Sequence, residues 1–424
     1  MPPSSVRATW ARLLSRRGYW SFFGPAVVTS VAYIDPGNFG TDIAAGAGFG
    51  YALLWSVVLA NLMAMLFQYL SGKVGLATGR SLASLVRERL GGRHRIVAYW
   101  LASESFALAT DLAEFLGVAL AIHLLLGLPL LYAAWIAAFD VLLLFALAGP
   151  RLARLRLLIS LLVAGVGLGY VYELAITRPS WPQALEHILI PRLGGYDTTL
   201  LVVGIIGATV MPHALVVHSW LTAKKASEGT GRPQLLKYHL WDTVANFGVA
   251  GLINMAILMM AAAAFYFNGL DVATMEEAYR TLSPLFGPAA AVVFALTLLF
   301  SGLSSSTVGV LAGQALLEDL LGSRLNVWLR RIIIRVVNVV PTSLAIMAGV
   351  KPLMVLVYSQ VVLSLLIPLP LVPLLLFTSD RRLMGEHVNS RITSALALLS
   401  ALVVLFLNAY LLLLIAQGKA LAAG

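Results

Sequence analysis

The sequence predicts an all-α integral membrane protein with about eleven transmembrane helices. Of its 424 residues, 60% are hydrophobic and only 11% are charged, and the mean hydropathy is +0.89. A soluble domain carries about 25% charged residues, so too few charges remain here to cover a surface that faces water. The apolar runs are long and continuous, which favours membrane-spanning helices over the alternating strands of a membrane barrel.

Each expected span is a run of about 20 or more apolar residues. In chain order we expect spans at about 22–48, 51–72, 96–124, 128–148, 155–177, 199–222, 241–267, 287–317, 327–349, 353–378 and 392–416. The basic N-terminus followed by an apolar run is similar to a signal peptide. That run is too long for one and contains Asp35, so we expect an uncleaved first span.

The loop charges predict the orientation. Lys and Arg gather before the first span and in the loops at 73–95, 151–156 and 224–237, whereas the loop at 268–285 is acidic. Because basic loops stay in the cytoplasm, we expect a cytoplasmic N-terminus and, after an odd number of spans, a C-terminus outside the cell. The net charge of 29 − 19 = +10 is then explained by these cytoplasmic loops and does not indicate a nucleic-acid partner. We expect a multi-pass protein of the inner (plasma) membrane, with the lipid bilayer as a partner, that functions as a monomer.

Two spans contain helix-breaking sequences. The first carries Asp35-Pro-Gly-Asn38 near its middle and the sixth carries Met211-Pro-His213. Proline removes a backbone donor, and unwound backbone at membrane depth is tolerated only where it is buried in protein or lines a cavity. A proline in one membrane helix is often only a kink. Breaks at matching positions of two halves, however, point to a transporter site at the interface of two repeats.

The residues around these breaks favour a metal ion. Asp35 and Asn38 supply a carboxylate and an amide oxygen, and unwinding frees main-chain carbonyls, with Ala32 and Ala208 as candidates. Met211 adds a thioether. Mg²⁺ and Ca²⁺ prefer shells made only of oxygen, whereas a thioether favours a softer transition metal. The alternative for Met211 is ordinary core packing. The chain has no cysteine, which excludes disulfides and thiolate metal sites.

These paired motifs resemble those of the Nramp family of proton-coupled manganese and iron transporters, in its bacterial branch. The similarity covers about residues 20–415 and includes the segments 109–117, 204–213, 302–306 and 359–360. The resemblance implies a LeuT-like fold, with inverted five-helix repeats at about 22–177 and 199–378 and an extra helix at about 392–416, within one transmembrane domain at 1–424. It implies metal bound by Asp35, Asn38, Met211, the carbonyls of Ala32 and Ala208 and, in some states of the cycle, Gln360.

A possible proton route lies along the third span. Glu104, Asp111 and Glu114 are seven and three residues apart, so they share one helix face. Structural ion pairs are the alternative to a relay. Span nine offers Arg330 and Arg331 as partners, followed by Arg335 and Asn338. The resemblance implies a proton route from the metal site through Asp111 and Glu114 toward these arginines. We expect Asp35 and His213, whose imidazole titrates near neutral pH, to couple the two ions.

The resulting hypothesis is a transporter rather than an enzyme, since no nucleophile–base set or phosphate-binding glycine loop appears. It would import Mn²⁺, and Fe²⁺ as well, together with protons by alternating access, with no resident cofactor. Two rivals stay open at this point. One is an organic-solute (amino-acid) symporter of the same architecture, and the other is a passive channel for metal or protons.

Overall fold

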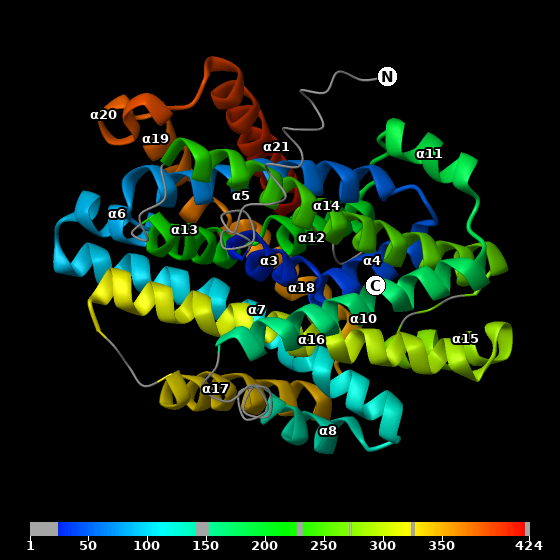
Figure 1. Ribbon diagram of the computed structural model, residues 1–424. Helices are drawn as coiled ribbons and strands as arrows, with labels where there is room; N and C mark the ends of the chain where they lie inside the picture. Colours follow the sequence, from blue (N-terminus) through cyan, green and yellow to red (C-terminus); the bar gives the residue numbers. More distant parts are fainter. Residues whose placement is uncertain are drawn as a thin grey trace, which may run out of the picture.

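The computed structural model describes residues 24–140, 152–226, 232–270, 272, 274–323 and 327–419, and all regular secondary structure in these ranges is helical (Figure 1). The elements up to residue 189 are α3 (Pro25–Ser30), η1 (Val31–Tyr33), α4 (Pro36–Phe49), α5 (Leu54–Thr78), α6 (Leu82–Leu90), α7 (Arg93–Leu126), α8 (Leu130–Ala137), α10 (Leu152–Thr177) and α11 (Trp181–Leu189).

The later elements begin with a second interrupted span. They are α12 (Tyr196–Val210), α13 (Pro212–Ala226), α14 (Arg232–Ala264), η2 (Tyr266–Asn268), α15 (Met275–Phe286), α16 (Pro288–Leu316), η3 (Leu317–Leu321), α17 (Val327–Met347), α18 (Pro352–Leu366), α19 (Pro368–Ser379), α20 (Arg381–Met384), η4 (Gly385–His387) and α21 (Arg391–Ala416).

The predicted spans correspond to these helices. Within the described ranges, eight helices or helix pairs are long and apolar enough to cross a membrane. The first span is divided into α3, η1 and α4, and the ninth is α17, with an apolar part at Ile332–Met347. α8 covers part of the fourth span, of which 141–148 lie outside the described residues. The break between α18 and α19 was not predicted, and it falls where Pro368 withholds a backbone donor.

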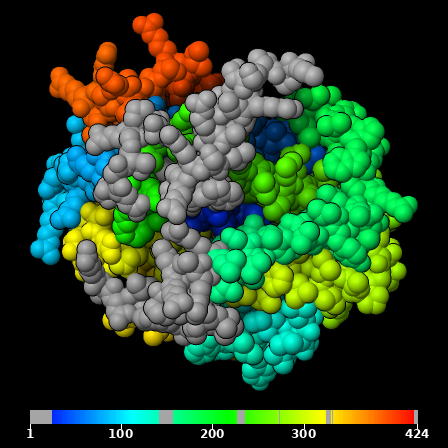
Figure 2. Space-filling view, viewed as in Figure 1, coloured from blue at the N-terminus to red at the C-terminus, as the bar shows by residue number. Residues whose placement is uncertain are grey.

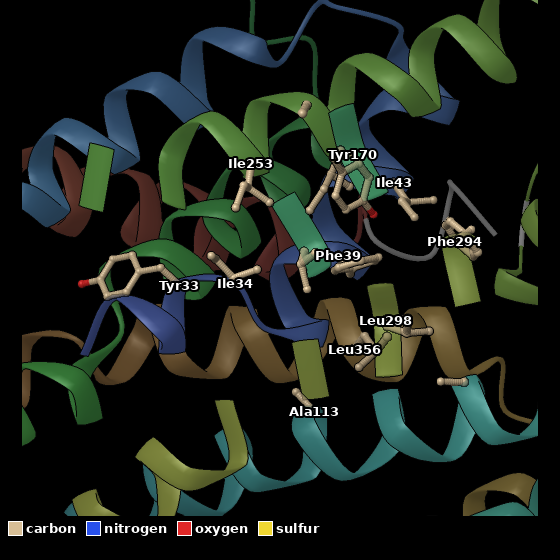
Figure 3. Packing of buried hydrophobic residues seen from close by; sticks show 14 of the residues in the cluster. Tyr33, Ile34, Phe39, Ile43, Ala113, Tyr170, Ile253, Phe294, Leu298 and Leu356 are labelled. Atoms are coloured by element: carbon tan, nitrogen blue, oxygen red, sulfur yellow. The ribbon is translucent and has the colours of Figure 1, made fainter. Parts of the chain in front are cut away.

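The two broken spans lie inside the helix bundle. α4 packs against α14 and α12, and α12 packs against α18 (Figure 1). α5, α7 and α16 lie around this centre, and only small areas of dark blue, the colour of the first broken span, show on the face in Figure 2. The apolar core around α4 includes Phe39, Ile43, Tyr170 and Phe294 (Figure 3). Burial by neighbouring helices is what allows a broken helix at membrane depth.

Glycines set how closely the helices approach the first broken span. A Cβ on Gly117 of α7 would overlap the ring of Pro36, and a Cβ on Gly46 of α4 would overlap the Leu258 carbonyl of α14. Small residues at such crossings let helix backbones approach within a membrane. α4 is therefore held in place by close packing on two sides.

We expect Gly46→Ala to destabilise the protein by about 1–3 kcal/mol, because the added methyl group must displace the backbone of α14. Gly48→Ala is the matched control on the same helix, since a Cβ there meets nothing within 4 Å. Thermal unfolding of both variants in detergent measures the difference. Equal melting temperatures for the two variants would contradict the close packing of α4 on α14.

Candidate metal site

The first break ends in a helix that begins at a buried carboxylate. Asp35 is 1% exposed and caps α4, with Oδ2 accepting a hydrogen bond from the Gly37 amide at 3.1 Å and Oδ1 accepting one from the Asn38 amide at 2.9 Å. Pro36 takes the first helical position, where its missing donor matters least. The amides and the positive end of the helix favour a negative charge on Asp35.

The second break is centred on Met211, between α12 and α13. This residue is fully buried and has a φ of 39°, a left-handed conformation that few residues other than glycine adopt. Such a conformation costs about 1–3 kcal/mol and persists where the surroundings impose it, often at functional sites. Pro212 then starts α13.

The two breaks meet at the side chain of Asn38. Its Nδ2 donates to Asp35 Oδ1 at 2.8 Å, to the Ala208 carbonyl at 2.9 Å and to the Tyr33 carbonyl at 3.2 Å. Its Oδ1 accepts from the Thr209 hydroxyl at 3.1 Å. Three oxygens from both broken spans therefore surround one amide nitrogen. Rotation of the amide by half a turn would add a fourth oxygen to this set, an arrangement suited to a cation.

Gln360 of α18 lies beside the same point. A Cβ on Gly37 would overlap the side-chain amide of Gln360 and approach Asp35 Oδ2. A Cβ on Gly207 would overlap the main-chain carbonyl of Gln360. Gln360 is fully buried, and its Nε2 donates to Ser359 Oγ at 3.0 Å while its Oε1 has no hydrogen-bond partner. A buried acceptor without a donor is a candidate ligand for a cation.

Two of the predicted ligands, Ala32 and Met211, lie next to the breaks without a hydrogen bond to Asn38 in the described part of the chain. The carbonyl of the first break that meets Asn38 belongs to Tyr33, while Ala32 lies one residue earlier in η1, buried. Met211 is buried next to the second break, in the position that the sequence predicted. In the described ranges no group of three or more His, Cys, Asp or Glu side chains forms a metal site. A metal here would therefore depend on one carboxylate and neutral donors.

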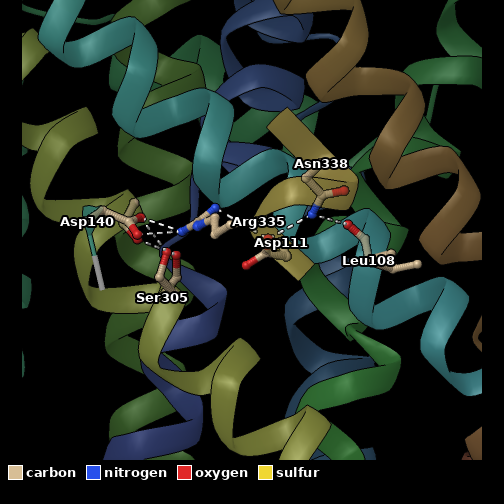
Figure 4. Close-up of polar contacts among 8 residues, drawn as sticks. Leu108, Asp111, Asp140, Ser305, Arg335 and Asn338 are labelled. Atoms are coloured by element: carbon tan, nitrogen blue, oxygen red, sulfur yellow. Dashed lines mark hydrogen bonds and ion pairs between the residues drawn. The ribbon is translucent and has the colours of Figure 1, made fainter. Parts of the chain in front are cut away.

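Two acidic residues of α7, Glu104 and Asp111, form ion pairs with α17. Arg330 Nη2 contacts both carboxylate oxygens of Glu104 at 2.8 Å. Arg335 contacts both oxygens of Asp140 at 2.6 Å and Asp111 at 3.4 Å, and Asn338 Nδ2 donates to Asp111 at 2.7 Å (Figure 4).

Not all of this pairing was predicted. The sequence placed Arg330, Arg335 and Asn338 opposite the α7 acids but gave Asp140 no role. The signal for Asp140 was a lone charge inside an apolar run. The side chain of Arg331 lies outside the described residues.

Glu114 of α7 and His213 of α13 are two further residues of the predicted proton route. Glu114 is fully buried, and a Cβ on Gly309 of α16 would approach its Oε2. His213 is fully buried, and its Nδ1 shares a hydrogen bond with Thr110 Oγ1 of α7 at 3.0 Å. One face of α7 thus connects the second break with α17. This is the geometry that a proton route along α7 would need; the route itself stays a prediction.

Sequence reasoning missed a further polar chain at the breaks. The Tyr33 hydroxyl donates to the Val210 carbonyl at 3.3 Å and accepts from Gln68 Nε2 at 2.8 Å. Gln68 Oε1 in turn shares a hydrogen bond with His218 Nδ1 at 2.8 Å. Nothing in the local sequence of Gln68 or Tyr33 indicates this role, because the three residues come from three different helices.

The fold and the site together define a class of protein. Helices broken at matching positions, which meet around a buried carboxylate in a helical bundle, are the features of a secondary transporter with its substrate site at a repeat interface. A family model described as "Natural resistance-associated macrophage protein-like" (Nramp) matches residues 26–414. The chain therefore belongs to the Nramp family, as the motifs indicated, and the family consists of transporters rather than enzymes.

Comparison with individual relatives supports the same family. The chain is 47% identical to a "Divalent metal cation transporter MntH" of Verminephrobacter eiseniae, covering 92% of this chain and 89% of that protein. It is 45% identical to one of Granulibacter bethesdensis, covering 97% and 93%. The crystal structure of the Eremococcus coleocola manganese transporter superimposes with a TM-score of 0.83 at 28% identity, covering 93% of this chain and 87% of that one. The nucleobase-cation symporter Mhp1, at 17% identity and a TM-score of 0.59, shares the fold, which confirms the LeuT-like architecture.

We expect Arg335→Met to destabilise the protein by about 3–5 kcal/mol, because it leaves Asp140 and Asp111 buried without their cation. Adding Asp140→Asn in the same chain should restore part of that loss, since one stranded charge is removed. Thermal unfolding of both single variants and the double variant, as a double-mutant cycle, measures the coupling. Additive losses would show that the pair contributes nothing.

Proposed function

We propose that this protein imports Mn²⁺, and Fe²⁺ as well, together with protons across the inner membrane by alternating access. The coarser statement, a divalent metal cation transporter, follows from its family and relatives. The observation that supports the finer proposal is the convergence of Asp35, Asn38 and the Ala208 carbonyl at the meeting point of the two breaks. Divalent metal ions and protons are then its substrates.

The chemistry of the donors favours a soft divalent ion. One carboxylate gives a limited negative charge, so the ion can be released again after each cycle, and the neutral oxygens complete the shell. Met211, buried at the second break, supplies a sulfur that Mg²⁺ and Ca²⁺ do not seek. Met211 also fills the space that an organic solute would need, which argues against the amino-acid symporter despite the shared fold.

The proposed cycle uses the ion pairs of α7. Metal enters from outside and binds at Asp35, and a proton leaves along α7 by way of Glu114 and Asp111. The orientation that the loop charges predict, with the N-terminus in the cytoplasm, makes this direction import. Metal release inward follows when the broken helices rock against the remaining bundle.

Uptake by proteoliposomes with an internal pH dye tests the proposal. Wild type should take up Mn²⁺ saturably and acidify the interior, whereas Asp35→Ala should lose about 3 kcal/mol of binding, roughly a hundredfold, because the sole carboxylate is gone. Asp197→Asn, which removes an exposed acid at the start of α12, is the control and should behave as wild type. Wild type that moves an amino acid but no metal would support the organic-solute symporter instead.

Met211→Ala tests the role of the thioether separately. Loss of the only soft donor should reduce the preference for Mn²⁺ over Ca²⁺ by about tenfold, or about 1.4 kcal/mol, while uptake continues. Competition between the two ions during uptake measures this ratio. An unchanged ratio would assign Met211 to core packing alone.

A further inference from the structure

Two buried acids lie apart from the ion pairs of α7. Asp42 is on α4, two helical turns after Asp35, and Glu173 is near the end of α10. Both side chains are 0% exposed, and neither oxygen of either carboxyl group has a hydrogen-bond partner. In the proposed orientation they lie between the metal site and the outside of the cell.

A tyrosine connects the two acids. Tyr170, one turn before Glu173 on α10, interacts electrostatically with both Glu173 and Asp42. Its ring packs against Phe39 with centroids 5.4 Å apart and lies beside Ile43, the residue after Asp42 (Figure 3). The Tyr170 hydroxyl is buried, and Thr297 of α16 is its polar neighbour. Two carboxyl groups without hydrogen-bond partners therefore lie near one tyrosine between α4 and α10.

No basic side chain faces this cluster from the described parts of the surrounding helices. Residues 36–49, 157–177, 250–264 and 288–316 contain no Lys, Arg or His. On α14, Lys237, His239 and Asp242 all precede residue 250, and His123 at the end of α7 pairs with Glu276. The other titratable groups on α4, α10 and the elements packed against them fall into three sets. Near the outer ends are Tyr172, Tyr196, Asp197, Tyr266 and Tyr358, and Asp35 and the α7 acids Glu104, Asp111 and Glu114 lie on the inner side. The remaining ones are at the far ends of their helices: Arg154 and Arg156 on α10, Arg232 and Tyr238 on α14, and Arg93, His94, Arg95 and Tyr99 on α7.

A buried carboxylate without a counter-charge is so unfavourable that it takes up a cation or a proton. A divalent ion needs several oxygen ligands, whereas the polar groups of this cluster in the described ranges are two carboxyl groups and one hydroxyl group, without the freed main-chain carbonyls of the breaks. A proton needs no such shell. Protonation also turns each carboxyl group into a donor, which the other carboxyl group or the Tyr170 hydroxyl can accept.

We propose that Asp42 and Glu173, with Tyr170 between them, form a site that holds protons on the outer side and passes them inward. In each transfer the O–H bond of the Asp42 carboxyl group breaks and an O–H bond forms on a water molecule at its inner side, and the proton of Glu173 then moves to Asp42. A hydronium ion outside the cell protonates Glu173 again and leaves a water molecule behind. This inference rests on the proposed proton coupling.

Infrared difference spectra of the full-length protein in lipid test the protonation directly. At neutral pH, Asp42→Asn and Glu173→Gln should each remove a C=O band of a protonated carboxylic acid from the wild-type spectrum. Tyr170→Phe keeps both acids and should shift these bands, because the polar hydroxyl group that interacts with both of them is lost. Glu276→Gln, which removes an acid of α15 outside the cluster, should leave them unchanged. If the two variants removed carboxylate bands and left the acid bands in place, the proposal would be overturned.

Proton entry during Mn²⁺ uptake tests the delivery. Both isosteric variants should lower the initial rate of proton entry roughly a hundredfold, the lower end of the range for removal of a group that transfers protons. Their Mn²⁺ dissociation constants should match that of wild type, which also shows that they are folded. Unchanged proton entry in the variants would overturn the delivery step. Wild type without metal-driven proton entry would overturn the proposed function instead, while the spectra would still decide whether the two acids are protonated.

Discussion

The structure depends on satisfying the backbone groups that the two breaks release inside the membrane. With no water in the hydrocarbon core, each freed carbonyl needs a donor from the protein. Asn38 serves the Ala208 and Tyr33 carbonyls, and Ser301 of α16 donates to the Ile34 carbonyl at 2.9 Å. Asn254 of α14 adds a bond to Tyr33 at 3.0 Å. The helices around the breaks are thus fixed by the need to supply these donors.

The need for donors to the freed carbonyls explains why polar residues and glycines occur together around the two breaks. A donor such as Asn38 reaches its carbonyls only when the helix backbones lie close together, and Gly37 and Gly207 permit that approach to α18. The same closeness brings the Gln360 amide next to Asp35. The convergence of carbonyl and amide oxygens at this point is therefore a consequence of how the breaks are stabilised.

The buried acids fall into two groups with different surroundings. Glu104 and Asp111 of α7 have cationic partners on α17, and Arg335 joins Asp111 with Asp140. Asp42 and Glu173 lie among helix segments, at 36–49, 157–177, 250–264 and 288–316, that contain no basic residue. Arginine therefore compensates the charges of the first group, whereas in the second group we propose that a proton takes this role.

The sequence by itself determined the class of protein and most of the spans, because hydropathy, loop charge and helix-breaking residues are local properties. It also predicted that Asp35, Asn38 and Met211 lie at breaks, since the Asp-Pro-Gly-Asn and Met-Pro-His motifs interrupt long apolar runs. Only the tertiary structure decided which carbonyl meets Asn38, which arginine pairs with Asp140, and that Tyr33, Gln68 and His218 form one chain. These contacts join residues more than a hundred positions apart or on different helices, and the packing angles and rotations that bring them together leave no periodic signal in the sequence.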